Sequence, residues 1–153
     1  TIEIQLPFVK YFFNKSKIIP VRLPQSEKAI DISQKITKLL LKDNVRFISL
    51  GSSDLTHYGP NYGFTSHGTG KNALDWVKNI NDKTLIDLAV NMEDEEVIKH
   101  VNKNDSACSA GAISAVIASA KELEVKKGTL LKYKTSFDVM PNDSFVGYAG
   151  IVF

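Results

Sequence analysis

Apolar residues recur every three or four positions along much of this chain, which is the spacing of one buried face of an α-helix. The pattern predicts a helix from Leu6 to Phe13, in which Pro7 fits only the first turn. Further helices are predicted over residues 26–42, 72–80, 83–91, 93–101 and 110–123. Each has one apolar face, so these helices require another layer to pack against.

Four shorter runs of β-branched and aromatic residues predict strands over residues 17–23, 45–50, 130–136 and 145–153. Strands and helices alternate in the first part of the chain. In the last strand, Gly147 and Gly150 indicate close contacts between the backbone and its neighbours. We therefore expect an α/β fold with a mixed β-sheet flanked by helices.

The length of 153 residues and the apolar content of 43% predict one domain over residues 1–153. The formal charge of +2 is spread along the chain, which argues against a nucleic-acid partner. The apolar run at residues 110–120 is too short to span a membrane. The single cysteine cannot form an internal disulfide, and no leader precedes the first helix, so we expect a cytoplasmic protein.

The strongest candidate for chemistry is the loop Ser52–Gly59, which follows a predicted buried strand. It places Asp54 three residues before His57, and loops at strand ends commonly carry sites. A carboxylate beside an imidazole can share a proton or a metal with it. From spacing alone, an Asp that caps the loop and a solvated His remain an open alternative.

Cys108 lies just before the helix predicted from Ala110, a position that favours the thiolate. A thiolate there can be a metal ligand or a nucleophile. The alternative is a buried cysteine that acts only as a small apolar side chain.

Two other candidate sites are weak. The run from His67 to Lys71 resembles a phosphate loop, but Thr65 and Asn72 replace residues that the Walker pattern requires. Thr1 could act as an amino-terminal nucleophile, yet nothing in the residues after it supports that role.

Four segments together resemble the Memo family, also called AmmeMemoRadiSam system protein B: Thr1–Phe8, Ser52–Gly59, Cys108 and Phe145–Ala149. The resemblance spans essentially the whole chain but only the C-terminal half of a usual member, so the N-terminal half is absent from this chain. The family is similar in fold to class III extradiol dioxygenases, whose chemistry depends on non-haem iron. The resemblance therefore implies a Memo-like, dioxygenase-like α/β domain.

The resemblance also implies a site for iron or copper. It assigns Asp54, His57 and Cys108 as metal ligands, with Asp54 and His57 also handling protons in catalysis. Two further histidines of the family site would come from the N-terminal half of the same protein or from a companion chain. The family's system name implies a radical enzyme as a further partner. A module that binds a peptide or small molecule without turnover is the alternative function.

The sequence departs from the family pattern at two positions. Ser109 follows the cysteine where the family usually has glycine, which is tolerable only if the backbone there has ordinary angles. Phe137 interrupts a usual Ser-Gly-Asp motif, while Asp138 keeps its expected position.

Overall fold

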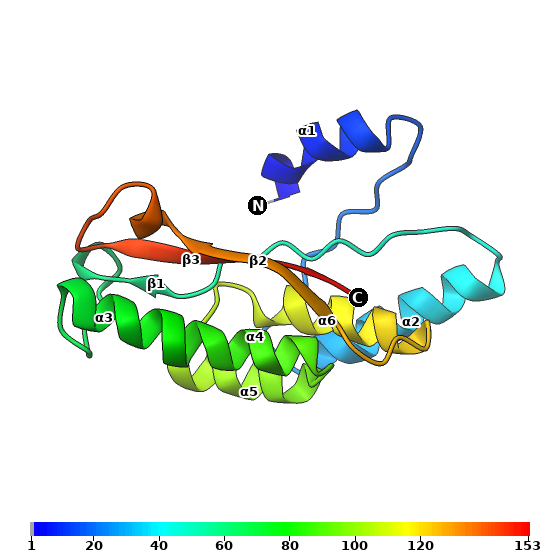
Figure 1. Cartoon of the computed structure of the whole chain (residues 1–153). Helices are drawn as coiled ribbons and strands as arrows, with labels where there is room; N and C mark the ends of the chain where they lie inside the picture. The colour runs from blue at the N-terminus through cyan, green and yellow to red at the C-terminus, as the bar shows by residue number, and fades with distance from the viewer. Residues whose placement is uncertain (1) are drawn as a thin grey trace.

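The computed structural model describes residues 2–153, so Thr1 and its predicted role lie outside the described residues. One layer of helices lies under a small sheet, and a further helix stands apart above it (Figure 1). The layer consists of α2 (Lys28–Lys42), α3 (Gly70–Trp76), α4 (Asp82–Val90), α5 (Asp94–Asn104) and α6 (Ala110–Glu122). The separate helix is α1 (Ile2–Phe12). The described elements confirm the predicted α/β class.

The sheet has three antiparallel strands in the order β1–β3–β2. β1 (His57–Tyr58) pairs with the start of β3 (Phe145–Val152), so that Tyr58 lies opposite Phe145. β2 (Thr129–Thr135) pairs along the rest of β3, with Tyr133 opposite Ala149. The short strand β1 therefore ties the loop that precedes it to the centre of the sheet.

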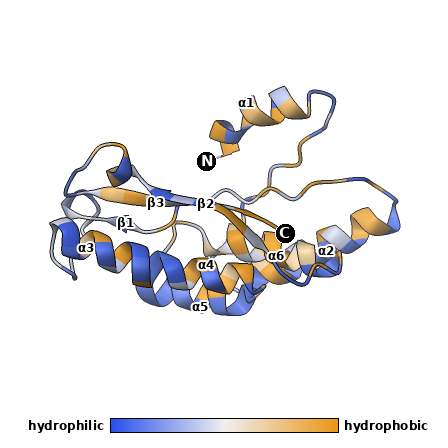
Figure 2. Ribbon diagram, in the orientation of Figure 1, coloured by the Kyte–Doolittle hydropathy of each residue, from blue (hydrophilic) through white to orange (hydrophobic). Residues whose placement is uncertain are grey.

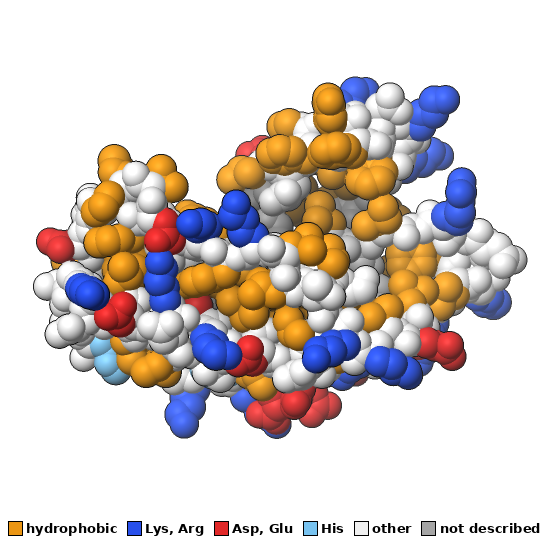
Figure 3. All heavy atoms as spheres, viewed as in Figure 1, with side chains coloured by type: hydrophobic (Ala, Val, Ile, Leu, Met, Phe, Trp, Pro, Cys, Tyr) orange, Lys and Arg blue, Asp and Glu red, His pale blue; other side chains and the backbone are white. Residues whose placement is uncertain are grey.

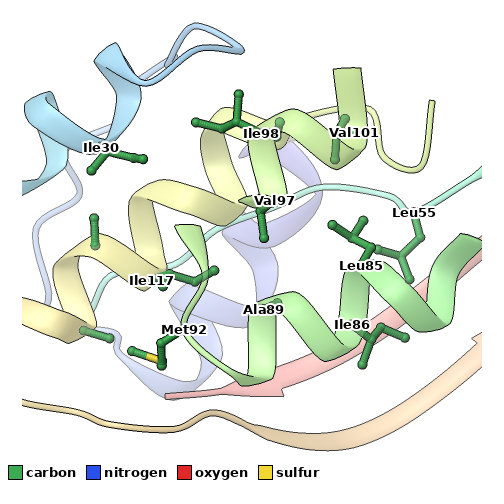
Figure 4. Packing of buried hydrophobic residues seen from close by; sticks show 13 residues of the cluster. Ile30, Leu55, Leu85, Ile86, Ala89, Met92, Val97, Ile98, Val101 and Ile117 are labelled. Atoms are coloured by element: carbon green, nitrogen blue, oxygen red, sulfur yellow. The ribbon is translucent and has the colours of Figure 1, made fainter. Parts of the chain in front are cut away.

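Two apolar clusters hold the sheet on the helices. The larger cluster joins α2, α4, α5 and α6, and includes Leu85, Val97 and Ile117 at its centre (Figure 4). The smaller cluster joins Tyr58 and Phe145 of the sheet to Ala73 and Val77. Burial of such side chains contributes about 1.5–3 kcal/mol each, which makes these clusters the main source of stability.

The helix predictions are largely confirmed, with two corrections. α1 begins at Ile2, not near Leu6, so Pro7 lies inside the helix. The proline removes one backbone hydrogen bond in the middle of the helix, and the residues after it continue as a helix. The stretches predicted as two helices at 72–80 and 83–91 form α3 and α4, which are joined directly by a π-helical turn, Val77–Asn81.

The predictions of strands at 130–136 and 145–153 are confirmed by β2 and β3. Those of strands at 17–23 and 45–50 are wrong for the described chain, because both segments lack regular secondary structure and pair with no strand. The observed sheet is consequently antiparallel. The expected alternation of strands and helices in the first part of the chain is not observed. Among the described residues, we find no helix with the length and apolar character needed to cross a membrane.

Candidate metal centre

The loop that contains Asp54 and His57 is fixed from both sides. Leu55 donates its N–H to the carbonyl of Gly147 at 2.9 Å, and Gly147 donates to the carbonyl of Thr56 at 3.0 Å. On the other side, the N–H of Cys108 donates to the carbonyl of Asp54 at 3.1 Å. The strand β3 and the loop before α6 therefore bring Asp54, His57 and Cys108 to one place.

The three side chains form a compact cluster. The Nε2 atom of His57 lies 3.2 Å from Oδ2 of Asp54, and the N–H of Asp54 donates to Sγ of Cys108 at 3.2 Å. One candidate ligand atom from each residue lies within 4.8 Å of the other two. The Asp54 and His57 side chains are 44% and 35% exposed, so the cluster is open to solvent. Their role as ligands stays a prediction.

Hydroxyl groups support the cysteine side of this cluster. The hydroxyl of Ser53 lies 3.6 Å from Sγ of Cys108 and accepts the N–H of Ser109 at 3.0 Å. Ser109 caps α6, because its side chain accepts the N–H of Ala112. Cys108 is exposed, so the interpretation of this residue as a buried apolar side chain is wrong.

The two departures from the family pattern fit the structure. Ser109 has a φ angle of −150°, which a serine adopts without the strain of the left-handed region. Phe137 packs edge-on against Phe145, with ring centroids 5.9 Å apart. Asp138 accepts the N–H of Thr135 at 2.7 Å and pairs with Lys78. These positions therefore keep local structure intact.

A buried carboxylate holds Thr56, the residue directly before His57. Asp82, at the start of α4, is fully buried and accepts both the N–H and the hydroxyl of Thr56. Its other oxygen accepts the hydroxyl of Tyr133 at 2.7 Å. Burial raises the pKa of Asp82, and the hydrogen bonds from Thr56 and Tyr133 oppose this rise. The backbone of the candidate site is thus anchored to a helix and to the sheet.

A second ring of polar groups extends this support. Asn81 donates to the hydroxyl of Thr56 at 3.0 Å, and its carbonyl lies 3.3 Å from Nε2 of His100. The other ring nitrogen of His100 lies 3.0 Å from the amide of Asn104, which fits a neutral imidazole that donates through Nε2. Burial also lowers the pKa of His100.

Sequence analysis missed this supporting network. The available signal was Asp82, a charged residue in phase with the apolar positions Leu85, Ile86 and Ala89 of the same helix. A charge on a buried helical face is rare unless it has partners. His67, by contrast, lies away from the cluster and stacks on Trp76 with ring centroids 3.7 Å apart.

A cavity of about 430 Å³ opens beside the cluster. It is lined by the following residues of both loops: Leu55, His57, Tyr62, Gly63, Phe64, Asp105, Ala107 and Cys108. The ring of Tyr62 lies 4.9 Å from that of His57, between centroids. The cavity brings apolar rings next to two of the predicted ligands, which is the composition of a small-molecule site.

The donor set fits a transition metal. Thiolate, imidazole and carboxylate together suit iron, copper or zinc better than calcium or magnesium, which prefer oxygen ligands. The three donors come from two loops, and two of them, His57 and Cys108, line the cavity that is open to solvent. Further ligands could therefore approach from the open side.

Comparisons with known proteins agree with the motifs. The family model described as Memo-like protein matches residues 1–152. A MEMO1 family protein of Methanosarcina mazei is 31% identical over 99% of this chain and 54% of its own length. MEMO1 family proteins of Methanococcus maripaludis and Methanococcoides burtonii are 32% and 28% identical over 99% of this chain, and over 51% and 54% of their own lengths. The chain thus spans about half the length of the relatives it matches, and it belongs to the Memo-like protein family.

Proposed function

We propose that Asp54, His57 and Cys108 bind a transition metal, iron or copper, as part of a redox centre with dioxygenase-like chemistry. The observation that carries this proposal is the convergence of three different donor atoms within 4.8 Å on two loops that are tied together. Thiolate, imidazole and carboxylate donors that meet at one place are a set that iron and copper sites use.

The residues have separate tasks in this proposal. Cys108 binds as a thiolate, and the N–H of Asp54 stabilises its charge at 3.2 Å. His57 binds through one ring nitrogen or exchanges a proton with a ligand in the cavity that it lines. Asp54, 3.2 Å from the imidazole, binds alongside it or orients it. When bound, the metal would supply Lewis acidity and would carry electrons from a small reductant to oxygen.

The proposed centre takes further ligands from outside this chain. The family resemblance implies two histidines from the other half of the protein, and the relatives are about twice as long as the part matched here. We therefore propose that the complete centre forms when this chain meets that half, within one protein or as a companion chain. Three ligands alone should bind metal more weakly than the complete set.

The test is metal titration of the chain with Co²⁺ as a spectroscopic probe, followed by Fe²⁺ and Cu²⁺. A thiolate-to-cobalt charge-transfer band is expected in the native chain and should be absent in Cys108→Ser. His57→Gln should weaken binding by more than about tenfold, since loss of even an indirect ligand contact costs about 10–100-fold. His67→Gln is the matched control, because that histidine stacks on Trp76 outside the cluster.

Binding of one ion with an unchanged affinity in Cys108→Ser and His57→Gln would refute the proposed site. Metal content measured by mass spectrometry on protein purified without added metal gives an independent count. A native chain that takes up no more metal than the two variants would also count against the proposal.

A second candidate function is the binding of a small molecule without turnover. It is favoured by the cavity, in which Tyr62 and Phe64 offer aromatic surfaces beside His57. This candidate predicts that a bound ligand slows hydrogen exchange of the cavity residues equally in the native chain and in Cys108→Ala. The metal-centre proposal predicts that the same variant loses the ligand together with the metal.

A further inference from the structure

The cavity beside the candidate metal centre is lined by an acid and by no base of the described chain. Asp105 is one of its lining residues, and none of them is Lys or Arg, although the sequence has 19 of these bases and 17 acids. Lys and Arg side chains are spread over several parts of the visible face of the molecule (Figure 3). The lack of bases is therefore a local property of the cavity.

Asp105 occupies a position where an acid is locally unfavourable. It is the C-terminal cap of α5, and its φ angle of 47° lies in the left-handed region. Its N–H donates to the carbonyl of Val101 at 2.9 Å, which fixes the backbone there. Glycine and asparagine suit such a position best, and an acid at this end of a helix meets the negative end of the macrodipole. Helix stability therefore does not explain a carboxylate here.

The other charges of α5 follow the macrodipole. Three acids stand in its first turn, at residues 94–96, and Lys103 stands in its last turn. Figure 2 shows α5 as a largely hydrophilic helix, in line with these charges. Asp105 reverses the pattern at the end of the helix that reaches the cavity. The carboxylate and the helix end therefore both add negative potential to the cavity.

The carboxylate of Asp105 makes no ion pair within residues 2–153. None of the ion pairs includes it, and Lys103, two residues before it, is not paired with it. Asp105 also stands outside the group of candidate metal ligands, which consists of Asp54, His57 and Cys108. Because Asp105 is exposed, its carboxylate is available to a ligand in the cavity that it lines.

Two aromatic rings line the same cavity. Tyr62 is 46% exposed, and its ring lies 4.9 Å from that of His57, between centroids. Phe64 packs against the buried ring of Tyr58, with centroids 5.1 Å apart. A cation near the face of an aromatic ring is attracted to it, more strongly where water is excluded. The rings therefore favour a cationic ligand too.

A bound metal ion would leave this preference in place. The Cys108 thiolate and the Asp54 carboxylate would balance the two charges of a divalent ion. Asp105 is not one of the candidate ligands, so its negative charge would remain in the cavity.

We propose that the cavity binds a small organic cation, a protonated amine on an apolar body, which pairs with Asp105 and packs on Tyr62 and Phe64. The cavity volume of about 430 Å³ lies in the range of small-molecule sites. This inference rests on the proposed function, because it names the class of molecule on which the metal centre would act.

The test is calorimetric titration of the chain, freed of metal with EDTA, at neutral pH. The probes are phenethylamine, phenethyl alcohol and phenylpropionate, which have similar size and differ in charge. We expect the amine to bind at least about tenfold tighter than the acid, with the alcohol between them. Asp105→Asn should weaken amine binding by about fivefold, as for an exposed charge pair, and asparagine suits the left-handed backbone. Tyr62→Leu should weaken it by about threefold, through loss of the attraction between cation and ring.

Asp43→Asn is the matched control, because Asp43 is likewise an exposed acid at the C-terminal cap of a helix, α2, and does not line the cavity. This variant should keep the Kd for phenethylamine within about twofold of the native value. The inference is overturned if no probe binds, if phenylpropionate binds as tightly as the amine, or if the Asp105 and Asp43 variants weaken amine binding equally.

A second titration, on the chain loaded with Co²⁺, separates this inference from the metal centre. Phenylpropionate is left out, because its carboxylate could bind the ion directly. Phenethylamine should still bind tighter than phenethyl alcohol, and Asp105→Asn should remove that difference. A chain without the thiolate-to-cobalt band that keeps the Asp105-dependent amine binding would refute the metal centre and support the preference for a cation. A chain with the band that binds the amine no tighter than the alcohol would support the centre and overturn the inference.

Discussion

The loss of the Asp82 carboxylate should destabilise this chain strongly, because the carboxylate accepts three hydrogen bonds in the interior. In Asp82→Ala, the N–H and hydroxyl of Thr56 lose their acceptor, and Thr56 is fully buried. The hydroxyl of Tyr133 loses its partner too, although Tyr133 is only half-buried and can turn towards water.

The magnitude follows from the donors that stay buried. Each unpaired buried donor costs about 1–3 kcal/mol, so the two groups of Thr56 account for roughly 2–6 kcal/mol. Removal of the carboxylate also removes the cost of burying its charge, which offsets part of the loss. We therefore expect Asp82→Ala to lower the free energy of unfolding by about 3 kcal/mol.

Urea unfolding followed by circular dichroism measures this change. The matched control is Asp87→Ala on the same helix, because Asp87 is exposed and pairs only with Lys83 across one helical turn. That control should change the free energy of unfolding by less than about 0.5 kcal/mol. A loss below about 1 kcal/mol in Asp82→Ala, with an unchanged slope against urea, would refute the role assigned to the buried network.

The pH dependence of the same residue supplies a second check. Burial raises the pKa of Asp82 above its ordinary value of 3.8, so the folded chain binds this proton more readily than the unfolded chain does. The contribution of Asp82 to stability is therefore greatest below pH 3.8 and falls as the pH rises through the folded pKa. Asp82→Asn should lose this dependence, and a profile parallel to that of the native chain would contradict the assignment.

Three other predictions concern stability. Gly147→Ala should cost at least about 1–3 kcal/mol in urea unfolding because the new methyl group would overlap Oδ2 of Asp82, whereas Gly150→Ala should cost almost nothing since no atom lies within 4 Å; equal effects would contradict the packing. Lys78 and the backbone N–H of Thr135 lower the pKa of Asp138 to about 2, so stability from Asp138 should be present above pH 3.8 and lost as the pH falls towards 2; Asp138→Asn should flatten that acid limb of a thermal unfolding series. Ser106→Ala should raise the midpoint of thermal unfolding, because the buried hydroxyl of Ser106 has no partner among the described residues; a lowered midpoint would indicate an ordered water there.

The sequence predicted the helices well because their apolar faces are buried against one another. The period of three to four residues in α2 and α6 therefore reports real packing, with Ile30 and Ile117 in the same cluster. The segments 17–23 and 45–50 have equally strong strand patterns, yet neither pairs within the described chain. β-branched and aromatic residues favour a strand, but a strand forms a sheet only where a neighbouring strand accepts its backbone hydrogen bonds. Local pattern alone cannot distinguish these cases.

The candidate site was partly predictable for a similar reason. Asp54 and His57 are three residues apart, so their proximity follows from sequence, while Cys108 was linked to them only through the family resemblance. The structure brings the cysteine to the same cluster through one backbone bridge between Leu55 and Ala107. The partner of Asp82 and Asn81 could not be assigned, because Thr56 lies 25 or more residues away in sequence.

The π-helical turn joins α3 and α4 into one continuous helix, whose first part packs in the smaller apolar cluster and whose second part packs in the larger one. Each residue turns an α-helix by about 100°, so in an uninterrupted α-helix Leu85 and Ala89 would point roughly opposite to Ala73. The wider turn at Val77–Asn81 takes up one extra residue, so the apolar residues of α3 and those of α4 lie on the same side of the helix. Deletion of the exposed residue Ile80 would convert the turn to a regular helix, rotate Asp82 away from Thr56, and turn the apolar residues of α4 away from the side on which Ala73 lies. The register of α4 relative to α3 therefore depends on the extra residue in this turn.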